Sequence, residues 1–141
     1  MISTILTFYI FIVMSLIAKI HMYWLKGGLW PGKDKQDLID KVIGRGDKLP
    51  SELAFIFVIL CFAFFAVFPV LVFYKVEMGI SGYEKYIFLI IAIIFILRAM
   101  SMYVPQVANK ATKIFLKYNN KYYVPLIASL AFAYFGLYYF Y

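Results

Sequence analysis

The sequence predicts an all-α membrane protein, an antiparallel bundle of four transmembrane helices that forms a single domain over residues 1–141. The first observation is composition: 65% of the residues are hydrophobic and only 15% are charged, whereas about 25% would be charged in a soluble domain. The second is that four apolar stretches reach the roughly 20 residues that a helix needs to cross a bilayer. They run approximately over residues 2–24, 53–74, 86–104 and 122–141.

The same composition excludes several other classes of protein. The chain is too apolar for a disordered protein or a nucleic-acid-binding domain, so no nucleic-acid partner is expected. Cys61 is the single cysteine, which leaves no internal disulfide. Neither a metal-ligand set nor a cofactor motif is evident, and we expect no cofactor.

The first apolar stretch resembles a signal peptide in its position at the N-terminus. It lacks a basic region before it and a small-residue cleavage site after it, so we expect it to remain as the first transmembrane helix. The second and third stretches are joined by a tight hairpin. Three small residues favour a chain reversal there, namely Gly79, Ser81 and Gly82.

The basic residues predict the orientation of the bundle, because lysine and arginine in short loops are retained in the cytoplasm. Seven of the fourteen basic residues lie from Lys19, at the inner end of the first stretch, to Lys48, and four lie between the third and fourth stretches, whereas the second loop has only Lys75 and Lys85. Both termini are therefore predicted to lie outside the cytoplasm.

The first loop is expected to contain a short amphipathic helix. Pro31-Gly32 and Asp34 are typical of a turn and a helix N-cap, and the helix would cover residues 35–43. Apolar side chains fall on one face of it, at Leu38, Ile39, Val42 and Ile43. We expect this interfacial helix to lie flat on the membrane with its apolar face toward lipid.

The third loop is expected to contain a second interfacial helix with a basic stripe. Its four lysines recur at spacings of three and four, at Lys110, Lys113, Lys117 and Lys121. Attraction to anionic lipid contributes about 1 kcal/mol per basic side chain near the surface. We expect these lysines to contact anionic lipid at the cytoplasmic face; a site for a specific anionic ligand is the alternative.

Arg98 lies within the third apolar stretch, about six residues from its inner end. A cation at such depth is normally paired, or it faces a polar cavity. The alternative is snorkelling, in which the long side chain reaches back to the interface. Pairing or a polar cavity is the favoured interpretation, and snorkelling is the alternative.

The segment from His21 to Pro31 follows the first helix and is unusually rich in aromatic side chains and glycine. His21 and Trp24 share a helix face, Gly27-Gly28 can release the chain into a turn, and Trp30-Pro31 can fix its exit. An aromatic belt at the membrane interface and a ligand-contacting segment are equally compatible with this pattern.

These features together predict a candidate ligand pocket in the inner half of the membrane. Arg98 would bind an anionic group of a lipid-like ligand and the aromatic rings would hold the apolar part. The residues assigned to this pocket are His21, Tyr23, Trp24 and Arg98, with Gln106 and Asn109 at its rim.

The chain resembles a family of small bacterial four-helix integral membrane proteins that is known only as a domain of unknown function. The residues that carry the resemblance are His21-x-Tyr23-Trp24-x-x-Gly27-Gly28-x-Trp30-Pro31, Arg98-Ala99 and Tyr123-x-Pro125-Leu126. The family has an acidic residue before the last element, where this chain has Asn119-Asn120. The resemblance implies a four-helix fold in the bacterial inner membrane and no known activity.

The leading functional prediction is a non-enzymatic membrane protein that binds a lipid-like ligand or a partner helix at the cytoplasmic side. An immunity or accessory protein that neutralises a membrane-acting toxin is the alternative. A lipid or quinone head-group enzyme is less favoured, because the chain has one histidine and no intramembrane carboxylate. A transporter would require a homo-oligomer, since four helices enclose little interior.

Overall fold

The computed structural model describes residues 1–80 and 82–141 and confirms the all-α architecture. Three long helices are α1 (Ile2–Leu25), α3 (Glu52–Phe73) and α4 (Glu84–Met100). The fourth path consists of α6 (Lys113–Tyr118), the π-helical turn η2 (Asn119–Tyr123) and α7 (Val124–Phe140), which together form a 28-residue span. All four are long and apolar enough to cross a bilayer, so the chain is a multi-pass membrane protein.

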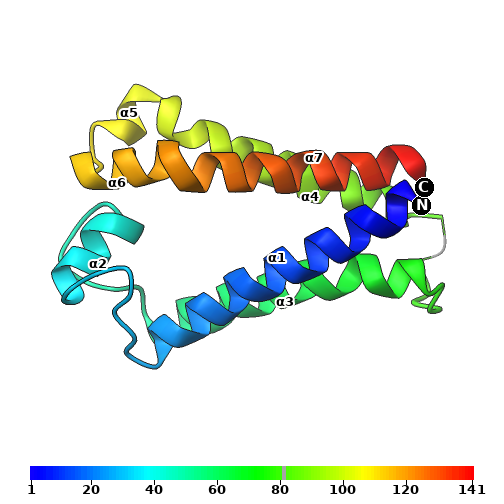
Figure 1. Cartoon of the computed structure of the whole chain (residues 1–141), viewed down its shortest axis with the longest axis horizontal. Helices are drawn as coiled ribbons and strands as arrows, with labels where there is room; N and C mark the ends of the chain where they lie inside the picture. Colours follow the sequence, from blue (N-terminus) through cyan, green and yellow to red (C-terminus); the bar gives the residue numbers. More distant parts are fainter. Residues whose placement is uncertain (81) are drawn as a thin grey trace.

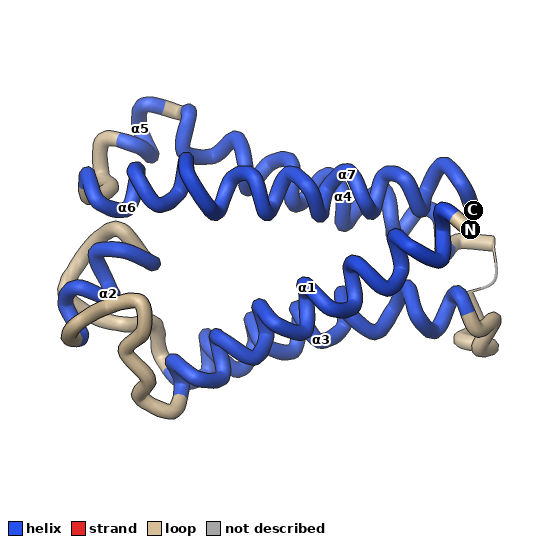
Figure 2. The backbone as a smooth tube through the Cα atoms, in the orientation of Figure 1, coloured by secondary structure: helices blue, strands red, loops and turns tan. Residues whose placement is uncertain are grey.

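The four long helices form two pairs (Figure 1). α1 packs along α3, α4 packs along α7, and the pairs are joined mainly by contacts between α1 and α7. The pairs converge where both termini lie and diverge toward the other side, where the short helix α2 (Lys35–Val42) is found (Figure 2). We call these two sides the terminal end and the loop end.

The buried core is concentrated toward the terminal end. In α1 the last buried residue is Met14, and in α7 the first is Leu130, so the loop-end parts of these helices contribute no buried residue. Large aromatic side chains fill the core and contact one another, among them Phe68, Phe88, Phe95 and Tyr134. Packing of these rings therefore joins the two pairs at one end only.

Pro69 in α3 creates a polar contact between the pairs. A proline has no N–H, so the carbonyl four residues earlier, that of Phe65, loses its helical donor. The hydroxyl of Tyr134 in α7 donates to this carbonyl. In a lipid environment an unpaired carbonyl is costly, and the partner helix supplies the missing donor.

The third loop differs from the prediction of a separate amphipathic helix. After α4 the chain forms the 3₁₀ turn η1 (Ser101–Tyr103) and the single turn α5 (Pro105–Ala108), and the fourth helix begins at Lys113 instead of residue 122. Thr112 caps this start, because its hydroxyl accepts from the backbone N–H of Phe115 at 3.2 Å. Three of the four lysines thus lie on the first turns of the fourth helical path, and Lys110 precedes it.

The second loop reverses as predicted at Gly79 and Gly82, whose φ angles of 69° and 88° are left-handed. Ser81, the third residue of the predicted turn, lies outside the described residues.

The first loop contains the predicted short helix, α2. Its N-cap is Asp34, whose carboxylate accepts from the backbone N–H of Asp37 at 2.9 Å. The expected lipid contact of its apolar face is wrong for Leu38 and Ile39, because the protein itself buries both side chains. An amphipathic pattern indicates an apolar environment for one face, but it does not say whether lipid or protein provides it.

Candidate ligand-binding site

The chain folds back sharply as it leaves α1. Gly27 has a φ of 88°, and Gly28 lies directly beneath the ring of Tyr23, where a Cβ atom would collide with it. The indole N–H of Trp24 donates to the carbonyl of Trp30 at 2.7 Å, and the backbone N–H of Trp30 donates to the Tyr23 hydroxyl at 3.4 Å. The prediction that Gly27-Gly28 allows the chain to turn after α1 is confirmed, and the hydrogen bond to Trp30 holds Trp24 in one orientation.

His21 is positioned by its own helix and by α3. Its Nδ1 lies 2.8 Å from the carbonyl of Ile17, one turn earlier. The imidazole packs edge-on against the rings of Trp24 and Phe62, each with a centroid distance of 4.9 Å. The ring is therefore fixed between α1 and α3.

A pocket of about 300 Å³ lies at the loop end, where α1, α2 and the start of α3 meet. His21 and Trp24 form the wall contributed by α1. The rest of the lining is aliphatic or aromatic and consists of Leu38, Val42, Ile43, Leu49, Pro50, Ala54, Phe55 and Val58. A largely apolar pocket with very few polar groups is typical of a site for an apolar ligand.

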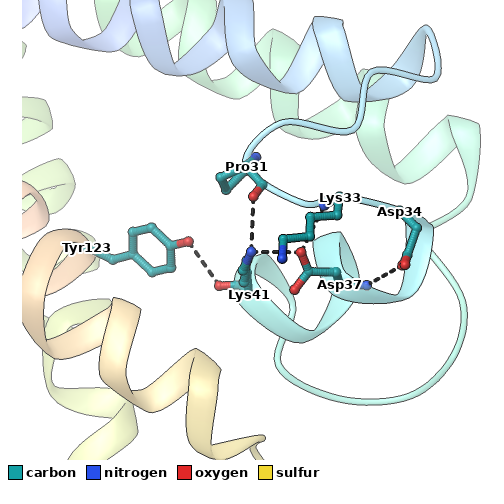
Figure 3. A network of polar contacts seen from close by, with 6 residues as sticks. All are labelled: Pro31, Lys33, Asp34, Asp37, Lys41 and Tyr123. Carbon is teal, nitrogen blue, oxygen red and sulfur yellow. Dashed lines mark hydrogen bonds and ion pairs between the residues drawn. The ribbon is translucent and has the colours of Figure 1, made fainter.

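The wall contributed by α2 is held in place by a polar network (Figure 3). The ammonium of Lys41 donates to Asp37 at 2.7 Å and to the carbonyl of Pro31 at 3.2 Å. Asp37 also accepts from the backbone N–H of Lys33 at 2.8 Å. The hydrogen bond from Lys41 lowers the pKa of Asp37, and the same bond raises the pKa of Lys41.

The C-terminal end of α2 is fastened to the other helix pair. The hydroxyl of Tyr123 donates to the carbonyl of Lys41 at 2.9 Å, as Figure 3 shows. Thr112 donates twice, through its hydroxyl to Asp40 O and through its backbone N–H to Gly44 O, both at 2.7 Å. α2 therefore bridges the two pairs at the loop end, where their long helices diverge.

The structure divides the six residues that the sequence analysis assigned to one pocket. His21 and Trp24 line it, whereas Tyr23 is exposed and covers Gly28. Arg98 belongs to α4, in the other pair. Gln106 in α5 and Asn109 directly after it are exposed. A shared binding role for all six stays a prediction.

Arg98 is half-buried, and its guanidinium lies 3.4 Å from the hydroxyl of Ser101, one turn closer to the loop end. Within the described part of the chain, the ion pair between Lys41 and Asp37 is the single salt bridge, so Arg98 has no carboxylate partner there. The side chain thus extends toward the loop end, as the snorkelling alternative requires.

The four lysines of the basic stripe are all exposed, at Lys110, Lys113, Lys117 and Lys121. The ammonium of Lys121 lies 5.1 Å from the centroid of the Tyr122 ring. Their contact with anionic lipid stays a prediction.

Over residues 1–80 and 82–141, no three His, Cys, Asp or Glu side chains lie close enough to hold a metal ion.

One polar feature was missed in the sequence. Asn119 is fully buried in η2, and its side-chain oxygen lacks a hydrogen-bond partner among the described residues. A π-helical turn is rare and often marks a functional position. The pair Asn119-Asn120 could have indicated this interruption of the helix from the sequence, since asparagine is a poor helix former.

Tyr123 and Pro125 were predicted as structural residues at the start of the fourth helix. Tyr123 ends the π-helical turn, and Pro125 stands in the first turn of α7, where a proline is tolerated.

Comparison with known proteins identifies a family for the chain and no described function. No curated protein and no solved structure matches the chain. A protein family described as "Protein of unknown function (DUF3995)" matches residues 14–134, which include parts of all four long helices and every residue of the pocket. The chain therefore belongs to the DUF3995 family.

Proposed function

We propose that this protein is a non-enzymatic membrane protein that binds an apolar, lipid-like ligand at the loop end. The observation that supports this function is the pocket between α1, α2 and α3, whose lining is apolar apart from His21 and the ring nitrogen of Trp24. Its volume of about 300 Å³ is at the lower end of the range for ligand pockets. It suits a single alkyl chain or a small ring better than a whole phospholipid.

The position of the pocket supports entry from the bilayer. Pro50 and Ala54 belong to its lining and are exposed, so the pocket opens at the start of α3. α2 closes the opposite side, where Leu38 and Val42 contribute to the lining. A chain that approaches along the outside of α3 thus reaches the pocket without separating α1 from α3.

We propose that the loop end lies in the cytoplasm, because eleven basic residues lie between residues 19 and 48 and between residues 110 and 121. The four exposed lysines of the basic stripe would then contact anionic lipid head groups. A reporter that is active only outside the cytoplasm tests the orientation. We expect activity when it is fused after Tyr141 and none when it is inserted near Lys48; the reverse pattern would invert the topology.

The binding function is tested by mass spectrometry of the protein purified in a mild detergent. Val58→Trp fills the pocket, and Leu60→Trp is the matched control because Leu60 is on the same helix and is 63% exposed. We expect a co-purified apolar molecule with the wild type and Leu60→Trp, and its loss with Val58→Trp.

Equal retention by all three proteins, or retention by none, would contradict the proposed function. Recovery of a second membrane protein in place of a lipid would favour the partner-helix prediction. The immunity prediction requires a different result, namely survival of cells exposed to a membrane-acting toxin only when this protein is produced.

A further inference from the structure

The hydrogen bond of His21 to its own helix determines which ring nitrogen carries the proton. The carbonyl of Ile17 is an acceptor only, so Nδ1, at 2.8 Å, must be the donor. At neutral pH an imidazole is mostly uncharged, and a neutral ring has a single N–H. Nε2 is therefore left with a free lone pair and acts as a hydrogen-bond acceptor.

No donor within the described residues reaches this lone pair. The Nδ1 bond is the single hydrogen bond of the His21 ring there. Nε2 is not among the fully enclosed polar atoms that lack a partner, and the His21 side chain belongs to the pocket lining. The other ring nitrogen in the pocket wall, that of Trp24, already donates to Trp30.

The charges around the pocket do not favour an anionic head group. The lining consists of His21, Trp24 and other aliphatic or aromatic residues. No lysine or arginine belongs to it. On α2, Lys41 forms an ion pair with Asp37 at 2.7 Å. Arg98, the cation to which the sequence analysis assigned the anionic group, lies in the other helix pair.

We infer that the ligand is an apolar molecule with a neutral hydroxyl group, and that the hydroxyl donates to Nε2 of His21 while the apolar part fills the pocket. This inference rests on the proposed function and names its ligand class. A long-chain alcohol or an isoprenoid alcohol has this chemistry. A fatty acid does not, because its carboxylate is ionised at neutral pH and has no proton to donate.

The test uses three probes that share one alkyl chain, namely 1-decanol, its methyl ether and decanoate. Binding is measured by the fluorescence of Trp24 in detergent micelles of fixed composition. Trp30→Phe removes the second of the two tryptophans, and it keeps the backbone carbonyl that Trp24 contacts. Only the alcohol can donate a hydrogen bond, so we expect it to bind about tenfold more tightly than the ether.

His21→Phe keeps an aromatic ring in the wall and removes the acceptor. We expect the ratio of alcohol to ether affinity to fall to about one, while the ether still binds. Retained binding of the ether shows that the variant is folded. If this variant does not fold, the ratios among the three probes in the wild type decide the question.

Two results would overturn the inference and leave the proposed function intact. They are equal binding of alcohol and ether, or stronger binding of decanoate than of the alcohol. In each case Val58→Phe, which fills the pocket without adding a tryptophan, must abolish binding. Binding of none of the three probes would overturn both the inference and the proposed function.

Discussion

The two helix pairs are held together by different contacts at the two ends of the molecule. At the terminal end, aromatic rings from α3, α4 and α7 pack into a continuous buried core. At the loop end, α2 bridges the pairs through three hydrogen bonds from Thr112 and Tyr123. Regions with few buried contacts open most easily, so we expect the loop end, which contains the pocket, to be the end that admits a ligand.

Removal of a core ring at the terminal end should have the largest effect on stability. Phe88 is fully buried against Phe68 and Tyr134, and Phe88→Ala would leave a cavity between the pairs. We expect the free energy of unfolding to fall by about 3 kcal/mol. This is the low end of the range for replacing a buried phenylalanine by alanine, because the unfolded helices remain in lipid, which is itself apolar. Phe132→Ala, at a residue that is 76% exposed, is the control and should change stability by less than about 0.5 kcal/mol. Unfolding in mixed micelles measures both.

The proline contact at the terminal end should have the next largest effect. Tyr134→Phe keeps the ring and leaves the carbonyl of Phe65 without its donor, which should cost about 1 to 2 kcal/mol. Pro69→Ala restores the helical N–H to this carbonyl. In that background we expect Tyr134→Phe to cost clearly less, and an equal cost in both backgrounds would contradict the role assigned to Pro69.

Loss of one hydrogen bond at the loop end should destabilise α2 and leave the stability of the rest of the bundle unchanged. Tyr123→Phe removes the bond to the carbonyl of Lys41, worth about 1 kcal/mol, so the amides of α2 should exchange with solvent about fivefold faster. Hydrogen exchange measured by mass spectrometry reports this change. Tyr122→Phe alters the exposed neighbouring residue and should leave α2 unchanged; faster exchange throughout α7 would mean that the two ends are not independent.

The ion pair of α2 should produce the smallest effect, which depends on pH. Because the pKa of Asp37 is below its ordinary value of 3.8, the stabilisation is present above that value and is lost as the pH falls through the lowered pKa. Because the pKa of Lys41 is above 10.5, the stabilisation is present below that value and is lost as the pH rises through the raised pKa. The pair is near the surface, so its contribution is modest.

Hydrogen exchange of α2 at several pH values, corrected for the intrinsic rate, measures this dependence. Asp37→Asn should remove it. Equal pH dependence in Asp37→Asn and in the wild type would assign the effect to another group.

The sequence was sufficient to predict the four long helices and the short helix of the first loop, because length, apolar composition and the Asp34 cap are local properties. The start of the fourth helix at Lys113 was missed, since the buried Asn119 and the π-helical turn interrupt the apolar pattern. The pairing of helices could not be predicted, because residues on every face of α3 are apolar. For that reason His21 and Arg98 were assigned to one pocket although they belong to different pairs.

The same reason explains why the environment of α2 was misjudged. Leu38 and Ile39 require an apolar neighbour, and both lipid and protein meet that requirement. The bonds from Thr112 to Asp40 and from Tyr123 to Lys41 connect residues more than 70 positions apart along the chain and help hold α2 against the bundle.

Photo-crosslinking with a decanol analogue that has a diazirine in its alkyl chain tests the pocket most directly. We expect adducts concentrated at residues of the pocket, in the peptides that contain Leu38, Phe55 and Val58, displaced by excess decanol and absent from Val58→Trp. Adducts spread over exposed residues of other helices, such as Leu97 and Phe132, that persist in the presence of excess decanol would contradict the account.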